Sequence, residues 1–177
     1  MTIIDLSQPI YDNMSVYPWD PEVHLTPVFT VEKDQWAVTR IEMVTHDATH
    51  VNVPRHIDTK WKTLSEYQLS DFIAETKVFQ TPKDVQKDKG VLFTDHPITM
   101  ELAKIIAKKK PAFAGLSEKF DFDLEAERYL LEQGIISFEK LTNCEQLPRN
   151  ETFTFYGIPL NIKDADGSPV RAFAVIK

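Results

Sequence analysis

The chain has 177 residues, 42% of them hydrophobic and 27% charged, which is enough to bury the core of one globular domain spanning residues 1–177. A formal net charge of -7 opposes binding to nucleic acid, and no apolar stretch is long enough to span a membrane. The single cysteine, Cys144, excludes an internal disulfide framework, and the N-terminus carries no secretory signal pattern, so we expect a cytoplasmic protein.

Strand patterns dominate the first half of the chain. Apolar and polar residues alternate in ways that predict strands at 2–6, 28–31 and 36–45, the last two forming a pair. The loop Tyr17-Pro18-Trp19-Asp20-Pro21 is stiff and aromatic. It suits a pocket wall and, equally well, a packed surface loop.

Strands alternate with two helices in the second half. Thr99 and Pro111 bracket a helix at 99–110, and Asp123 and Gly134 bracket another at 123–133. The strand patterns lie at 70–73 with 78–80, 90–94, 112–116, 135–138, 153–162 and 170–176, with a turn cluster at 164–169. This mixture indicates an α/β or α+β fold in one domain.

Three of the five histidines, His46, His50 and His56, fall within eleven residues. Imidazole is the commonest protein ligand for transition metals. His50 and Asn52 are two residues apart on a strand that Pro54 ends, so their side chains share one face. The clustering favours a metal site over three unrelated histidines that cap turns or pair with carboxylates, although spacing alone does not name the metal.

The segment from His46 to His56 resembles the signature His-x-Gly-Thr-His-x-Asp-x-Pro-x-His of the cyclase family of metal-dependent hydrolases, which includes bacterial kynurenine formamidases and isatin hydrolases. The opening at 5–10 and the closing segments at 159–162 and 166–172 are also similar to that family. The resemblance implies a mixed β-barrel-like sheet with flanking helices, of the swivelling β/β/α type. It also implies a homodimer or a higher homo-oligomer.

The resemblance further implies the roles of individual residues. His46, His50 and Asn52 match three metal ligands of the signature, and His56 matches its general acid/base. Two later ligands, a His and a Glu twelve residues on, correspond to Glu127 and Glu139. The family uses one or two divalent ions, zinc or manganese, and Trp19 and Phe72 are the residues expected to contact an aromatic small-molecule substrate.

Three departures from the signature concern this site. Asn52 stands in place of Asp, Ala48 in place of Gly, and Glu127 in place of the later His. The Asn52 and Glu127 exchanges leave the net ligand charge unchanged, and the added carboxylate favours manganese or iron over zinc. Without the resemblance, Glu127 reads as a solvated helix residue, and Glu139 as a partner of Lys140. His24 and His96 match no ligand position.

The function expected from the resemblance is metal-dependent hydrolysis of an amide, formamide or cyclic amide bond. The default is an arylformamidase that acts on N-formylkynurenine. The main alternative is a degenerate family member that binds a metal or a small acid without turnover. A third possibility is a structural domain in which the histidines are satisfied core groups.

Overall fold

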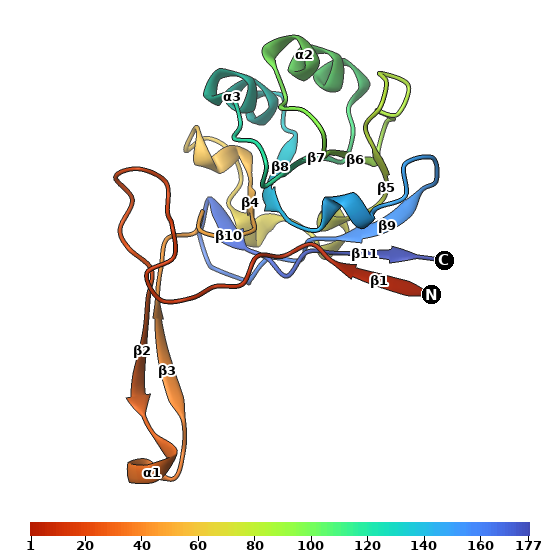
Figure 1. Ribbon diagram of the computed structural model, residues 1–177. Helices are drawn as coiled ribbons and strands as arrows, with labels where there is room; N and C mark the ends of the chain where they lie inside the picture. The colour runs from red at the N-terminus through yellow and green to blue at the C-terminus, as the bar shows by residue number, and fades with distance from the viewer.

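A nine-stranded mixed sheet curls into a half-barrel in the computed structural model, which describes residues 1–177 (Figure 1). Its order is β1-β11-β9-β5-β6-β7-β8-β4-β10, with β5 to β8 parallel and the other neighbours antiparallel. The predicted α/β domain with a barrel-like mixed sheet is therefore confirmed. The strands are β1 (Thr2–Asp5), β4 (His50–Asn52), β5 (Ile73–Val78), β6 (Gly90–Phe93), β7 (Phe113–Ser117), β8 (Ile136–Leu141), β9 (Phe153–Tyr156), β10 (Gly167–Pro169) and β11 (Phe173–Ile176).

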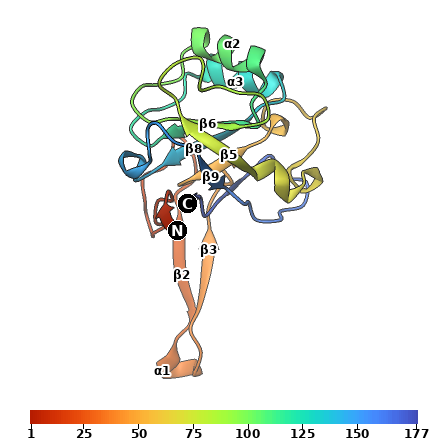
Figure 2. The same cartoon turned by 90° about the vertical axis from the view of Figure 1, so that its right-hand side faces the viewer.

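Two helices, α2 (Met100–Lys109) and α3 (Leu124–Glu132), cover the outer face of the sheet (Figure 2). They connect β6 to β7 and β7 to β8, because parallel neighbours need a crossover connection. The Thr99 hydroxyl accepts the N–H of Leu102, and the Asp123 carboxylate accepts two N–H groups, so both predicted caps are confirmed. Leu124, the first residue of α3, is an apolar side chain that is 65% exposed.

The sheet separates two apolar cores. One lies between the sheet and helices α2 and α3, and the other lies within the curl. Inside the curl, the rings of Phe113, Phe138 and Phe155 pack with centroids 4.9 to 5.1 Å apart. Each fully buried aromatic side chain of this kind contributes on the order of 2 kcal/mol of hydrophobic stabilisation. None of the helices combines the length and the apolar composition that crossing a membrane requires.

A second, two-stranded sheet forms an arm that extends away from the body (Figure 1). Its strands β2 (His24–Phe29) and β3 (Val38–Glu42) pair antiparallel, and the short helix α1 (Val31–Asp34) lies at the tip. The predicted pairing is confirmed, but the first strand runs over 24–29 and not 28–31, because Val31 begins α1. Every residue of β3 is exposed, so the arm has no core of its own.

The sequence patterns misplaced several short elements. Residues 167–169, expected as a turn, form β10 on the free edge of β4, where backbone pairing outweighs the weak strand preference of Gly and Pro. Residues 70–72 belong to a 3₁₀ helix, and residues 157–162 lie outside β9. The 3₁₀ helices are η1 (Pro54–His56), η2 (Leu64–Glu66), η3 (Leu69–Phe72) and η4 (Cys144–Gln146).

Candidate active site

A cavity of about 690 Å³ is lined by residues of β4, of β8 and of the N-terminal half of α3. Segments far apart in the chain line it, including the loop at 15–20 that precedes the arm. Six of the predicted site residues line this one cavity: His46, His50, Asn52, His56, Glu127 and Glu139. The fold therefore brings together residues that lie up to 93 positions apart, from 46 to 139.

Strand β4 presents His50 and Asn52 on one side, while Val51 between them is fully buried in the core. Antiparallel pairing with β8 sets His50 opposite Glu139, and the His50 Nε2 atom lies 3.3 Å from Glu139 Oε1. The other ring nitrogen, Nδ1, lies 2.8 Å from the carbonyl oxygen of Ala48. Ala48 has a φ of 55°, a left-handed conformation that explains why the signature carries Gly here.

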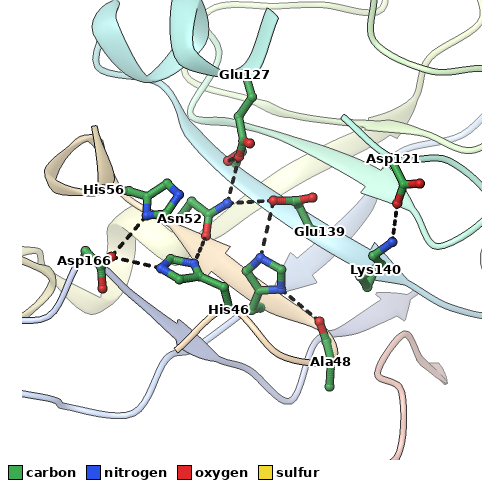
Figure 3. A network of polar contacts seen from close by, with 11 residues as sticks. His46, Ala48, Asn52, His56, Asp121, Glu127, Glu139, Lys140 and Asp166 are labelled. Carbon is green, nitrogen blue, oxygen red and sulfur yellow. Dashed lines mark hydrogen bonds and ion pairs between the residues drawn. The ribbon is translucent and has the colours of Figure 1, made fainter. Parts of the chain in front are cut away.

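The Asn52 side chain joins the two glutamates (Figure 3). Its amide nitrogen donates to Glu127 Oε1 and to Glu139 Oε1, both at 2.7 Å. Its oxygen lies 2.7 Å from Nδ1 of His46. Ser137, on β8, donates a further hydrogen bond to Glu127 at 2.7 Å. The amide therefore holds two carboxylates together, a task that an aspartate at this position cannot perform.

The pKa values of the two glutamates are shifted in opposite directions. Burial, together with the neighbouring Glu139 charge, raises the pKa of Glu127 above its ordinary value. Burial is the largest single influence on Glu139 and raises its pKa, but the hydrogen bond and charge of His50, together with hydrogen bonds to Glu127 and Asn52, outweigh it and hold the pKa of Glu139 low. Neither glutamate has a lysine or arginine partner.

A divalent cation fits this donor set. Glu127 and Glu139 share one site, and no lysine or arginine offsets the negative charge that they carry when ionised. Imidazole nitrogens of His46 and His50 face the same cavity. Mixed imidazole and carboxylate sets bind zinc, manganese and iron.

Asp166 is a site residue that the sequence patterns did not indicate. Its Oδ2 atom lies 2.9 Å from His46 Nε2 and 3.1 Å from His56 Nδ1. The ligand atoms of these three residues lie within 4.8 Å of one another, a spacing that suits a metal ion. The Asp166 hydrogen bond, opposed by burial, raises the pKa of His56, and the two histidines hold the pKa of Asp166 far below its usual range.

Two predicted substrate contacts are not found in the cavity wall. Phe72 is 2% exposed and packs in the core beside Tyr67, so the expected contact between Phe72 and substrate is wrong for this chain. Trp19 is fully exposed and turns away from the cavity, although its neighbours Tyr17, Pro18 and Asp20 line it. The loop therefore forms part of the cavity wall, but Trp19 itself does not line the cavity.

The other two histidines lie outside the cavity lining, as expected. His24 lies at the base of the arm, and His96 packs edge-on against Phe79 and Phe93. Cys144 is buried, and burial raises its thiol pKa to about 12, which agrees with a structural role.

Several known proteins are similar to this chain over nearly its whole length. Kynurenine formamidases of Salinibacter ruber and Geobacillus thermodenitrificans are 24% and 27% identical over 206 and 203 residues, covering 97% and 96% of this chain and 96% and 95% of theirs. A solved isatin hydrolase bound to the product analogue thioisatinate has a TM-score of 0.82 at 16% identity, covering 98% of this chain and 92% of its own. A potential metal-dependent hydrolase with cyclase activity has a TM-score of 0.77 at 21% identity, covering 99% of both chains. The family model described as "Putative cyclase" matches residues 4–138, and with this match over most of its length the chain belongs to the cyclase family.

Proposed function

We propose that this protein is a metal-dependent hydrolase of an amide, formamide or cyclic amide bond. The observation that carries the proposal is the convergence of two imidazoles, two glutamates and His56 on one cavity. A volume of about 690 Å³ suits a small organic substrate. Relatives named kynurenine formamidase and the isatin hydrolase fold make N-formylkynurenine the first substrate to test.

The residues that would hold the metal are His46, His50, Glu127 and Glu139. Asn52 has one atom suited to ligation, its oxygen, because its nitrogen donates to both glutamates. When bound, zinc or manganese supplies Lewis-acid polarisation of the substrate carbonyl and lowers the pKa of water. One or two ions are compatible with this number of donors.

His56 is the proposed general acid/base. Its side chain is 36% exposed and lines the cavity, while its Nδ1 atom faces Asp166. The opposite nitrogen, Nε2, is therefore the atom that takes a proton from the attacking water and returns it to the leaving nitrogen.

The test combines metal content with turnover. Protein purified without chelator is expected to contain a stoichiometric divalent metal by elemental analysis and to hydrolyse N-formylkynurenine or isatin. His56→Ala should keep the metal and lose about 10²- to 10⁴-fold in kcat. His96→Ala, a histidine outside the cavity, is the matched control and should retain normal kcat.

A second candidate is a family member that binds a metal or small acid without turnover. The observation that favours it is Asn52, a neutral residue where the signature has a carboxylate. Metal uptake without turnover of either substrate would select this candidate. Absence of both metal and turnover would refute the hydrolase proposal.

A further inference from the structure

We infer that Asp166 is a positioning residue that fixes the orientation of two imidazoles with different tasks, His46 and His56. This inference rests on the proposed function, because it takes His46 as a metal ligand and His56 as the acid/base. It adds a residue that the histidine-rich signature does not contain, located 110 positions after His56.

The hydrogen bonds of one oxygen atom carry the inference. Asp166 Oδ2 lies 2.9 Å from His46 Nε2 and 3.1 Å from His56 Nδ1, and the two ring centroids are 4.1 Å apart. An ionised carboxylate only accepts hydrogen bonds, so both of these nitrogens must carry hydrogen. In neutral His56 the lone pair is then on Nε2, which is the nitrogen the proposed proton transfer needs.

The same hydrogen bond selects the ligating nitrogen of His46. With Nε2 donating to Asp166, the nitrogen left for ligation is Nδ1, which donates to the Asn52 oxygen at 2.7 Å and would give up that hydrogen when a metal binds. Metal-binding histidines commonly donate their second ring N–H to a carboxylate, which fixes the ring and strengthens the ligand. Asp166 provides this carboxylate for His46.

Asp166 acts through the histidines and not on the substrate. His46 and His56 line the cavity, whereas Asp166 does not. Figure 3 shows Asp166 on the outer side of both rings, with Asn52 and the glutamates on the inner side.

The backbone around Asp166 fixes the position of its carboxylate. Its carbonyl oxygen accepts the Val53 N–H at 3.1 Å, and the next residue, Gly167, pairs with Asn52 in the β10–β4 ladder. The Thr45 hydroxyl donates to Asp166 Oδ1 at 3.2 Å. A Cβ atom on Gly167 would lie 2.6 Å from His46 Cε1, so glycine is what allows the ring to lie this close.

The experiment compares Asp166→Asn with Asp164→Asn. Asp164 lies in the same turn, is exposed and contacts neither histidine, and Asn tolerates its φ of 61°. Long-range ¹H–¹⁵N NMR of the imidazoles reports the tautomers in metal-free and zinc-loaded protein. Zinc affinity by calorimetry, and kcat and KM for N-formylkynurenine, complete the comparison.

The amide introduced by Asp166→Asn can turn its NH₂ group to the rings, which would move the hydrogen of His56 from Nδ1 to Nε2. We expect that change in the NMR spectrum, a loss of about 10²- to 10⁴-fold in kcat and a KM within threefold of normal. Zinc affinity should fall about 10- to 100-fold. Asp164→Asn should behave as the unaltered protein. Thr45→Val, which frees one carboxylate oxygen, should give smaller changes of the same kind and replaces Asp166→Asn if that variant does not fold.

An unchanged His56 tautomer together with a kcat within threefold of normal would overturn the inference. Loss of one full equivalent of bound zinc would also overturn it, because that result would make Asp166 a ligand. If the unaltered protein hydrolyses no substrate, the proposed function fails, while the NMR comparison still decides whether Asp166 sets the two tautomers.

Discussion

The replacement Asn52→Asp tests whether the amide holds the two glutamates together. In the structure its nitrogen donates to Glu127 and Glu139, each at 2.7 Å, and Asn52 is only 1% exposed. The variant removes both donors and places a third carboxylate against the other two. A hydrogen bond to a charged group contributes about 1.5–3 kcal/mol, so the metal-free variant should lose about 3–6 kcal/mol of unfolding free energy. For a domain of this size that is a fall of about 6–24 °C in Tm.

The assay is thermal unfolding at pH 8, with excess chelator and then with saturating zinc. Zinc should restore more stability to Asn52→Asp than to the unaltered protein, because a third carboxylate strengthens the binding of a divalent cation. Asn143→Asp is the matched control. The Asn143 nitrogen donates one bond, at 2.8 Å, to the backbone oxygen of Asp5. It should therefore lose about 1 kcal/mol and gain nothing from zinc.

A Tm for metal-free Asn52→Asp within about 2 °C of normal would refute this reasoning. It would mean that the amide does not donate to two ionised carboxylates. If zinc raised the Tm of Asn52→Asp and of the unaltered protein equally, the idea that Asn52 limits the affinity of the site for metal would be refuted.

Three further predictions concern other parts of the chain. Gly167→Ala should weaken zinc binding about tenfold in calorimetry, because the new Cβ displaces the His46 ring; normal affinity would contradict this. Burial raises the pKa of Tyr67 to about 12, so stability present below pH 10 is lost as pH rises toward 12, and Tyr67→Phe should flatten the alkaline fall in Tm. We expect a homo-oligomer through the arm, and Ile41→Lys, but not Thr26→Lys on the opposite face of the arm, should shift light-scattering mass toward the monomer; a monomeric unaltered protein would contradict this.

The sequence predicted the features that depend on neighbouring residues, such as helix ends and the histidine cluster. Thr99 caps the start of α2, Asp123 caps the start of α3, and Gly134 follows the end of α3. Each of these signals acts on residues only a few positions away. The histidine cluster was visible because three ligand-type side chains lie within eleven residues. Alternation along β4 explains why His50 and Asn52 face the cavity together, whereas His46 lies before this strand and His56 lies after it in η1.

The missed features depend on contacts between distant residues. Asp166 reaches His46 across 120 positions, through a strand of Gly, Ser and Pro that has no strand preference of its own. The pattern around Phe72 showed an apolar residue but not which side of the curled sheet it would face. Trp19 is fully exposed and has a positive φ of 80°, and the surrounding prolines indicated neither feature.

The position of β11 has a consequence for the order in which the chain folds. This last strand lies inside the sheet, between β1 and β9, so the first strand of the chain is paired only with its last (Figure 1). During synthesis, residues 2–5 have no partner strand until β11, which ends at residue 176, has emerged from the ribosome. Contacts of such long separation slow folding, and until they form, β1 and β9 each expose an unpaired edge. Removing the final five residues should therefore unpair two strands at once, whereas removing the first five takes away only one edge strand.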